Sequence, residues 1–182
     1  MARIKHGIIG TGGMARGHAG AFNKVRGVEV FGCYDVAPGR AEAFARDHGV
    51  RHAMDSLDDL LDACDAVSIV TPDAFHAELS LKALGAGKHV LCEKPLTTTL
   101  ADARKVARAA ETAAQKHGVV HMVNFSYRNS SQFQQALRIA GSGRLGAIRH
   151  VTGRYFQAWL ASTVWGNPAT HEAWLWRQQV PA

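Results

Sequence analysis

A glycine-rich turn near the N-terminus constrains the fold of this chain more than any other feature. The turn has the pattern G-x-G-x-x-A and comprises Gly10, Thr11, Gly12, Gly13, Met14 and Ala15. It follows the apolar run Ile4–Ile9, which has strand character, and it opens a helical pattern. In this context the first glycine permits a tight turn, the second lets the backbone approach a pyrophosphate, and the alanine lets the helix pack closely. The pattern is typical of a dinucleotide-binding turn, where the free N–H groups of a helix N-terminus meet phosphates.

Apolar runs rich in β-branched residues alternate with helical patterns along the first two thirds of the chain. The later strand candidates are Val28–Tyr34, Ala66–Val70, His89–Cys92 and Val119–Val123. Helical stretches are expected near residues 13–24, 38–47, 57–63, 74–86 and 100–117. Capping boxes at Ser56-x-x-Asp59 and Thr99-x-x-Asp102 mark two helix starts, and Gly118 ends the last helix. This alternation predicts an α/β fold, a Rossmann-type doubly wound parallel sheet over residues 1–122.

The pattern changes after about residue 123. A capping box at Ser131-x-x-Gln134 predicts a helix that ends near Gly141, and the alternating stretch Ala147–Trp159 predicts one long strand. One helix and one strand do not bury a core of their own. We therefore expect residues 123–182 to be the beginning of an incomplete second domain of the α+β type. An exposed strand would favour self-association, so a homo-oligomer is expected.

Composition narrows the class of protein. The net charge is +6, and all of it lies in residues 112–182, which carry 7 Lys and Arg and a single acid, Glu172. These basic residues are spaced singly and are not interleaved with aromatic residues along one face, so nucleic-acid binding is the weakest hypothesis. No apolar run suits a membrane span or a signal peptide, and we expect a cytoplasmic protein without a membrane partner. Cys33, Cys64 and Cys92 are interpreted as small buried residues.

An acidic residue ends the second predicted strand. Asp35 lies 25 residues after Gly10, where a carboxylate accepts hydrogen bonds from the ribose hydroxyls of the adenosine half and repels a 2′-phosphate. This favours NAD over NADP. Arg40 follows closely, and an arginine can pair with a 2′-phosphate. Arg40 is equally well explained as a surface charge, so NADP stays possible.

Two further segments follow predicted strands and therefore face the same ligand cleft. One contains Thr71, Pro72 and His76, and its Asp73 is also a candidate helix N-cap. The other is Glu93-Lys94-Pro95. At this place Lys94 can donate a hydrogen bond to a substrate oxygen. Desolvation can also lower the pKa of a lysine enough for proton transfer.

Together these motifs resemble the glucose–fructose oxidoreductase and inositol dehydrogenase family, also called Gfo/Idh/MocA. The resemblance extends through Asn124-Phe125-Ser126-Tyr127-Arg128 and covers essentially the whole chain. It implies a two-domain enzyme that transfers hydride between NAD(P) and a sugar, cyclitol or related polyol. The resemblance further implies that residues 123–182 begin the substrate and oligomerisation domain and that the chain is truncated within it. It also implies that Glu93 binds the nicotinamide ribose and Lys94 contacts the reacting oxygen. Tyr127 and Arg128 would lie on the substrate side.

One departure from the family pattern bears on catalysis. Members usually carry a later Asp-x-x-x-His whose histidine is the acid/base, and this chain has no Asp after Asp102. We therefore expect cofactor binding without appreciable turnover. The alternative is a non-catalytic dinucleotide-binding module, such as a sensor or partner subunit. No metal site is expected, because the pairs His48/His52 and His117/His121 each span a helix-breaking glycine.

Overall fold

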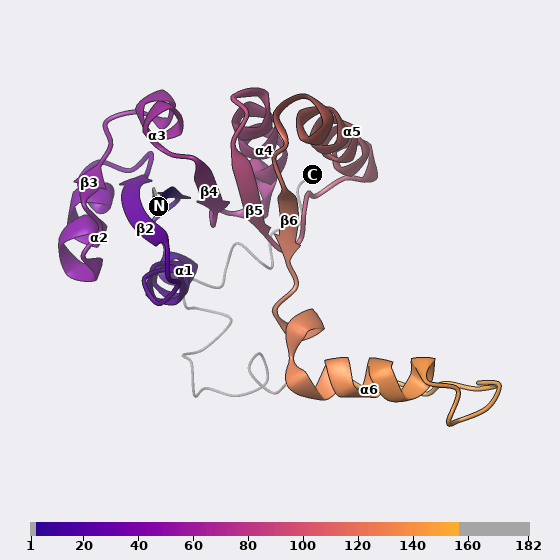
Figure 1. The fold of residues 1–182 in the computed structure, drawn as a ribbon. Coiled ribbons are helices and arrows are strands. Elements are labelled where there is room, and N and C mark those ends of the chain that lie inside the picture. Colours follow the sequence, from indigo (N-terminus) through magenta and orange to yellow (C-terminus); the bar gives the residue numbers. More distant parts are fainter. Residues whose placement is uncertain (1–2, 157–182) are drawn as a thin grey trace. The chain divides into compact units, whose positions relative to one another are not determined.

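The computed structural model describes residues 3–156 and contains a six-stranded sheet (Figure 1). All pairs of neighbouring strands are parallel, and the strand order is β3-β2-β1-β4-β5-β6. The strands are β1 (Ile4–Ile9), β2 (Val28–Tyr34), β3 (His52–Ala53), β4 (Ala66–Ile69), β5 (His89–Glu93) and β6 (His121–Asn124). This order is that of the doubly wound Rossmann fold, in which the direction of winding reverses between β1 and β4. The predicted fold class is confirmed.

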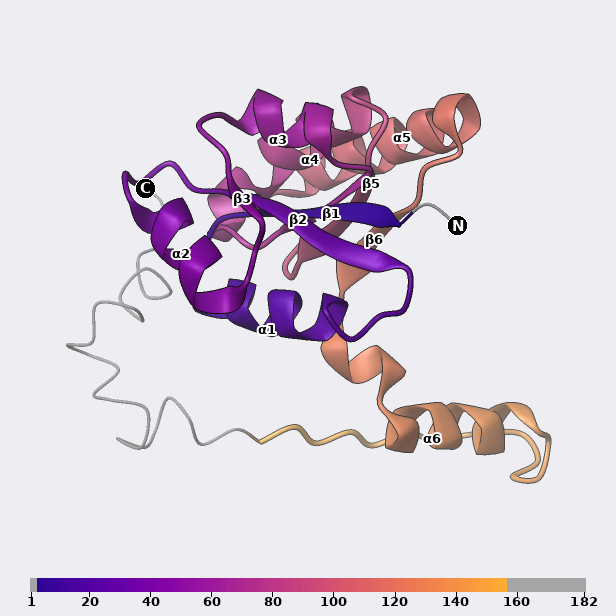
Figure 2. The ribbon, with the colours of Figure 1, turned by 60° about the vertical axis from the view of Figure 1, so that its left-hand side comes forward.

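Helices cover both faces of the sheet. Figure 2 shows α1 and α2 on one face and α3, α4 and α5 on the other. Their bounds are α1 (Gly13–Phe22), α2 (Arg40–His48), α3 (Leu57–Ala63), α4 (His76–Gly85) and α5 (Leu100–His117). Side chains of successive strand residues point to opposite faces, so Ile8 packs among the residues of α1 and α2 whereas Ile9 packs with those of α3 and α4. Because both faces of the sheet are buried, the sequences of its strands are continuous apolar runs.

The helix ends form as their sequence signals predict. The Ser56 hydroxyl accepts the Asp59 backbone N–H at 3.1 Å and donates to the Asp59 carboxylate at 2.6 Å. Thr99 and Asp102 make the same pair of bonds at the start of α5. Gly118 follows α5 with a φ of +67°, the left-handed conformation that ends a helix.

Two local expectations need correction, and one strand was missed. The short strand β3 was not predicted, because two residues carry too little pattern to detect. Asp73 is not an N-cap: Pro72 precedes the 3₁₀ turn η1 (Asp73–Phe75), in which Asp73 is the first residue. The predicted strand 147–159 is wrong over its described part, because residues 147–156 form no strand. A strand needs a neighbour for its N–H and C=O groups, and the sheet of the described residues does not extend to this segment.

The chain divides into two compact units, residues 1–131 and 132–182. The first contains the whole sheet, including β6. Helix α6 (Ser131–Gly141) confirms the helix predicted there and belongs almost entirely to the second unit. Residues 157–182 lie outside the described part, and so does the end of the predicted strand. Within residues 3–156, no helix has the length and apolarity needed to cross a membrane.

Candidate functional site

The predicted site residues follow the carboxyl ends of neighbouring strands. The registers pair Ile9 with Ile69, Ile69 with Cys92, and Cys92 with Val123, so β1, β4, β5 and β6 end level with one another. The segments that come next in the chain therefore begin along a single edge of the sheet. In open α/β folds this edge, at the point where the winding reverses, is where ligands bind.

The two motif glycines meet different constraints. Gly10 has a φ of +88°, and a Cβ there would stand 2.8 Å from Thr71 Cγ2, so this position needs glycine for the fold itself. Gly12 has an ordinary φ of −74°, and a Cβ there would meet only Arg40 Nη2, at 3.9 Å. The fold therefore leaves space at Gly12 that it does not use, which suits the approach of a ligand.

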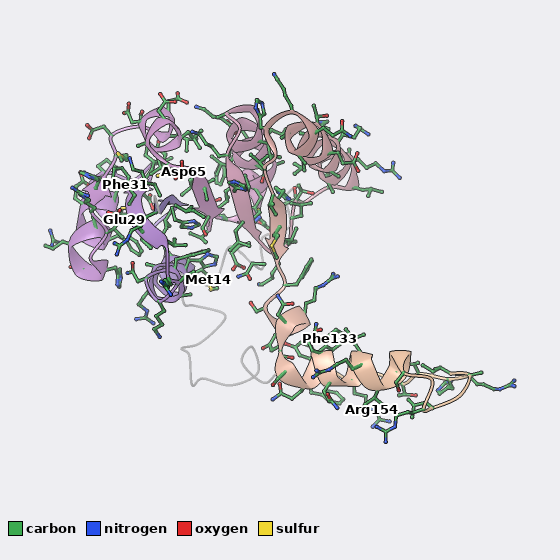
Figure 3. All side chains as sticks on the ribbon, viewed as in Figure 1. Met14, Glu29, Phe31, Asp65, Phe133 and Arg154 are labelled. Carbon is green, nitrogen blue, oxygen red and sulfur yellow. The ribbon has the colours of Figure 1, made fainter. Side chains whose placement is uncertain are left out.

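The first turn of α1 is open to an anion. Gly12 is the N-cap and offers no side chain for capping, and no acidic residue occupies the first turn of this described helix. Gly13 is exposed, and Met14 projects into solvent with 51% of its surface accessible (Figure 3). Ala15 is fully buried, which allows the helix to approach the sheet closely. Uncapped N–H groups and the helix dipole together favour a phosphate here.

The Asp35 carboxylate lies beside this turn at the end of β2. Its Oδ2 accepts the N–H and the hydroxyl of Thr11, both at 2.7 Å, and its Oδ1 accepts the Ala37 N–H at 2.9 Å. Burial by itself raises the pKa of Asp35, but these hydrogen bonds and the nearby Arg40 outweigh it and hold the pKa below its usual value. Arg40 Nε lies 3.8 Å from Oδ2, and the arginine is 55% exposed. Asp35 is thus a carboxylate at neutral pH, with the exposed Arg40 guanidinium next to it.

The segment after β4 is tied to the segment after β5 by one buried histidine. His76 is 1% exposed, and its ring nitrogens contact the carbonyl oxygens of Thr71 at 2.9 Å and Pro95 at 2.7 Å. Carbonyl oxygens only accept hydrogen bonds, so whichever ring nitrogen carries hydrogen donates to the carbonyl beside it. Because the ring lies between the two carbonyls, we expect His76 to shape the site through these two segments. The Thr71 hydroxyl is buried without a hydrogen-bond partner among the described residues, and Pro72 is exposed.

Glu93 is the most constrained acid of the site. It is 5% exposed, and its Oε1 accepts His18 Nε2 at 3.0 Å and Asn124 Nδ2 at 2.6 Å. Its Oε2 accepts the Lys94 N–H at 3.2 Å. Burial raises the pKa of Glu93, but the bonds from His18 and Asn124 outweigh this effect and lower the pKa overall. Glu93 is therefore held as a carboxylate with fixed orientation.

Sequence reasoning missed the histidine that donates to Glu93 and the polar residues behind it. His18 lies three positions after Ala15, so the two share the buried face of α1, and its Nδ1 lies 3.0 Å from Ser68 Oγ. His6 Nε2 contacts the same hydroxyl at 2.9 Å. A histidine on an inward helix face and a serine inside a buried strand are signals that point to such a polar cluster.

The remaining predicted residues are exposed at the same edge. Lys94 follows Glu93 with its side chain in solvent, so the described residues do not supply the desolvation expected for proton transfer. Tyr127 and Arg128 lie in the 3₁₀ turn η2 (Ser126–Asn129), just after β6, and both are exposed. Their substrate-side role stays a prediction.

Among the described residues, the cysteines and histidines form neither a disulfide nor a metal site. Cys33, Cys64 and Cys92 are buried and unbridged, and burial raises the pKa of each thiol to about 11. They match the interpretation as buried core residues. Within residues 3–156, no group of His, Cys, Asp and Glu side chains is arranged to hold a metal ion.

The edge of the sheet therefore carries the kinds of group that bind a dinucleotide. The space at Gly12 and the open turn of α1 suit the pyrophosphate, Asp35 suits ribose hydroxyls at one end, and Glu93 suits hydroxyls at the other. The Thr71 hydroxyl, which has no hydrogen-bond partner within residues 3–156, offers one more polar contact between them.

Comparison with known proteins agrees with this geometry. Residues 4–125 match the family model for Gfo/Idh/MocA proteins, described as an oxidoreductase family with an NAD-binding Rossmann fold. The chain is 35% identical over 144 residues to glucose-6-phosphate 3-dehydrogenase of Bacillus subtilis (strain 168), covering 79% of this chain and 40% of that protein. It is 34% identical over 160 residues to inositol 2-dehydrogenase of Salmonella typhimurium (strain LT2), covering 85% and 46%.

A solved structure gives the same result for the fold. Scyllo-inositol dehydrogenase from Lactobacillus casei, with bound NAD(H) and scyllo-inositol, aligns with a TM-score of 0.72 at 26% identity. The alignment covers 79% of this chain and 42% of that one. This chain thus spans less than half the length of each of these relatives.

Proposed function

Because the chain belongs to the Gfo/Idh/MocA oxidoreductase family, whose NAD-binding Rossmann fold matches residues 4–125, we propose that it binds NAD(H), the cofactor for hydride transfer with a sugar, cyclitol or related polyol. Residues 1–182 contain no Asp-x-x-x-His acid/base motif, so we expect them to bind the cofactor without appreciable turnover. The observation that carries the proposal is the open first turn of α1 beside the ionised Asp35, at the point where the sheet reverses its winding. Relatives named for glucose 6-phosphate and inositol support the substrate class.

Each residue of the edge has a role in this proposal. The N–H groups that begin α1 bind the pyrophosphate, and Asp35 accepts hydrogen bonds from the adenosine ribose. Glu93 accepts from the ribose on the nicotinamide side. The bound nicotinamide supplies the hydride acceptor or donor, and Lys94 donates a hydrogen bond to the reacting substrate oxygen.

Calorimetric titration of the folded 182-residue protein with NADH and with NADPH tests the proposal. We expect saturable heat with NADH and weaker binding of NADPH. Folded protein that gives no heat with either nucleotide would refute cofactor binding at this edge.

Self-association belongs to the same proposal. Apolar side chains of the second unit are exposed, among them Leu137, Leu145, Ile148 and Val151. Such side chains favour burial against another surface. Sedimentation velocity at increasing concentration tests this, and a monodisperse monomer at high concentration would contradict it.

A further inference from the structure

A network of polar side chains, most of them buried, includes Glu93 and lies near the edge of the sheet at the carboxyl ends of its strands. Its members come from four strands and a helix: His6 of β1, His18 of α1, Ser68 of β4, Glu93 of β5 and Asn124 of β6. The first four are no more than 6% exposed. Ser68 Oγ lies 2.9 Å from His6 Nε2 and 3.0 Å from His18 Nδ1. His18 Nε2 in turn lies 3.0 Å from Glu93 Oε1.

The chemistry of the groups fixes the direction of the decisive bond. A carboxylate only accepts, so His18 Nε2 donates to Glu93 whether the imidazole is neutral or charged. In the neutral ring, His18 Nδ1 then accepts the Ser68 hydroxyl hydrogen. The Ser68 oxygen in turn accepts a hydrogen from His6 Nε2. His6 itself stacks on Phe22, with ring centroids 3.9 Å apart, which holds this end of the network in place.

These hydrogen bonds make the two carboxylate oxygens of Glu93 unequal. Oε1 accepts side-chain bonds from His18 and Asn124, whereas Oε2 accepts a backbone N–H from Lys94. A carboxylate oxygen has two lone pairs, so Oε1 is saturated and Oε2 keeps one. The carboxylate cannot rotate without breaking both side-chain bonds.

We propose that His18 is a positioning residue of the cofactor site, which holds Glu93 so that Oε2 faces the ribose hydroxyls on the nicotinamide side. The proposal rests on the proposed function above. A buried polar network is not needed for stability, because well-packed apolar residues often serve a core as well or better. The need to hold a ligand-binding carboxylate in one orientation explains why these buried side chains are polar.

The test compares two substitutions of His18 with a matched control. His18→Leu fills similar space but donates nothing to Glu93. His18→Gln can present an amide N–H to Glu93 and an amide oxygen to Ser68, since the two polar atoms of an amide have nearly the spacing of the imidazole nitrogens. His117→Gln makes the same chemical change at an exposed residue at the end of α5.

The probes are NADH and ADP, because ADP lacks the nicotinamide riboside. We expect His18→Leu to weaken NADH binding about tenfold or more, which is ~1.4 kcal/mol. ADP binding should be unchanged, and His18→Gln and His117→Gln should keep NADH affinity within about threefold of the parent protein. A general loss of structure would instead weaken both probes.

Three results would overturn the proposal: unchanged NADH affinity in His18→Leu, equal loss for ADP, or a loss in His18→Gln as large as in His18→Leu. If His18→Leu does not fold, ¹⁵N NMR of the parent protein decides the matter. Protonated Nε2 on His18 is required, and a neutral ring protonated only at Nδ1 would refute the bond to Glu93. A parent protein that binds neither NADH nor ADP would refute the proposed function, and this proposal with it.

Discussion

Gly10 and Thr71 meet where the segments after β1 and β4 come together: a Cβ at residue 10 would stand 2.8 Å from Thr71 Cγ2 and 3.1 Å from the Thr71 nitrogen. The contact joins residues 61 positions apart, and Gly10 also has a φ of +88°. Gly10→Ala should therefore lower the free energy of unfolding by about 2 kcal/mol, from backbone strain and the clash together. Urea denaturation measures the change, and stability within 0.5 kcal/mol of the parent would contradict it.

Gly12→Val should abolish NADH binding and leave the fold intact. The backbone at Gly12 has a φ of −74°, and a Cβ would meet only the exposed end of Arg40, at 3.9 Å, so the substitution is tolerated locally. The valine would occupy the space that the pyrophosphate needs. Calorimetry with NADH, beside a thermal melt, measures both properties.

Gly20→Val is the matched control for this change, since Gly20 lies on the same helix with no atom within 4 Å of its Cβ position. The control should bind NADH as the parent does. If Gly12→Val also kept its NADH affinity, the phosphates would lie elsewhere.

Asp35 should decide the preference for NADH over NADPH. Its carboxylate is ionised and repels a 2′-phosphate, so Asp35→Asn should shift the ratio of the two dissociation constants toward NADPH about tenfold, ~1.4 kcal/mol. Parallel titrations with both nucleotides measure this ratio. Tighter binding of NADPH by the parent protein would overturn the role given to Asp35.

Arg40→Ala separates the two explanations of Arg40. A loss of NADPH affinity alone would show pairing with the 2′-phosphate, as its position 3.8 Å from Asp35 permits. Unchanged affinity for both nucleotides would show a surface charge.

Stability should fall as the pH drops below neutral, because His6 is buried in its neutral form. Burial and the neighbouring His18 lower the pKa of His6 from 6.5 to about 4. The unfolded chain therefore binds a proton between these values that the folded protein does not, so stability is full above about pH 6.5 and declines toward pH 4. Burial lowers the pKa of His121 as well, which acts in the same direction.

Between pH 7.5 and pH 5 we expect His6 to remove about 2 kcal/mol of unfolding free energy. Urea denaturation at both values measures the loss. In His6→Gln the decline should be smaller, since glutamine does not titrate. An equal decline in both proteins would assign the effect to other groups.

The 182-residue chain should bind NADH without turning over sugars or cyclitols at an appreciable rate. It contains no Asp beyond Asp102 and hence no Asp-x-x-x-His motif, and a positioned general base contributes roughly 10²–10⁴-fold to such a reaction. NADH formation from a panel of hexoses and inositols measures turnover, with a full-length relative as control. A rate within about tenfold of that control would refute the expectation.

Local sequence determined much of this protein. The glycine turn, the capping boxes and the apolar runs each act within a few residues of the chain, so they predict the order and type of the helices and strands and the α/β class. The positions of Gly10, Asp35 and Glu93 at the ends of strands were predicted from sequence for the same reason, because each of these strands has a recognisable pattern. The stretch 147–156 shows where prediction from local sequence fails. Its alternating pattern predicts a strand, but it has no neighbouring strand to pair with among the described residues.

Tertiary structure decided how these pieces meet. Glu93 depends on His18, 75 residues earlier, and His76 joins the carbonyls of Thr71 and Pro95. No local pattern encodes such contacts, because they exist only after parallel pairing has placed β1, β4, β5 and β6 side by side. The sequence predicts which groups bind a dinucleotide, whereas the fold sets the orientation of the Glu93 carboxylate, because the residues that donate hydrogen bonds to it come from distant elements.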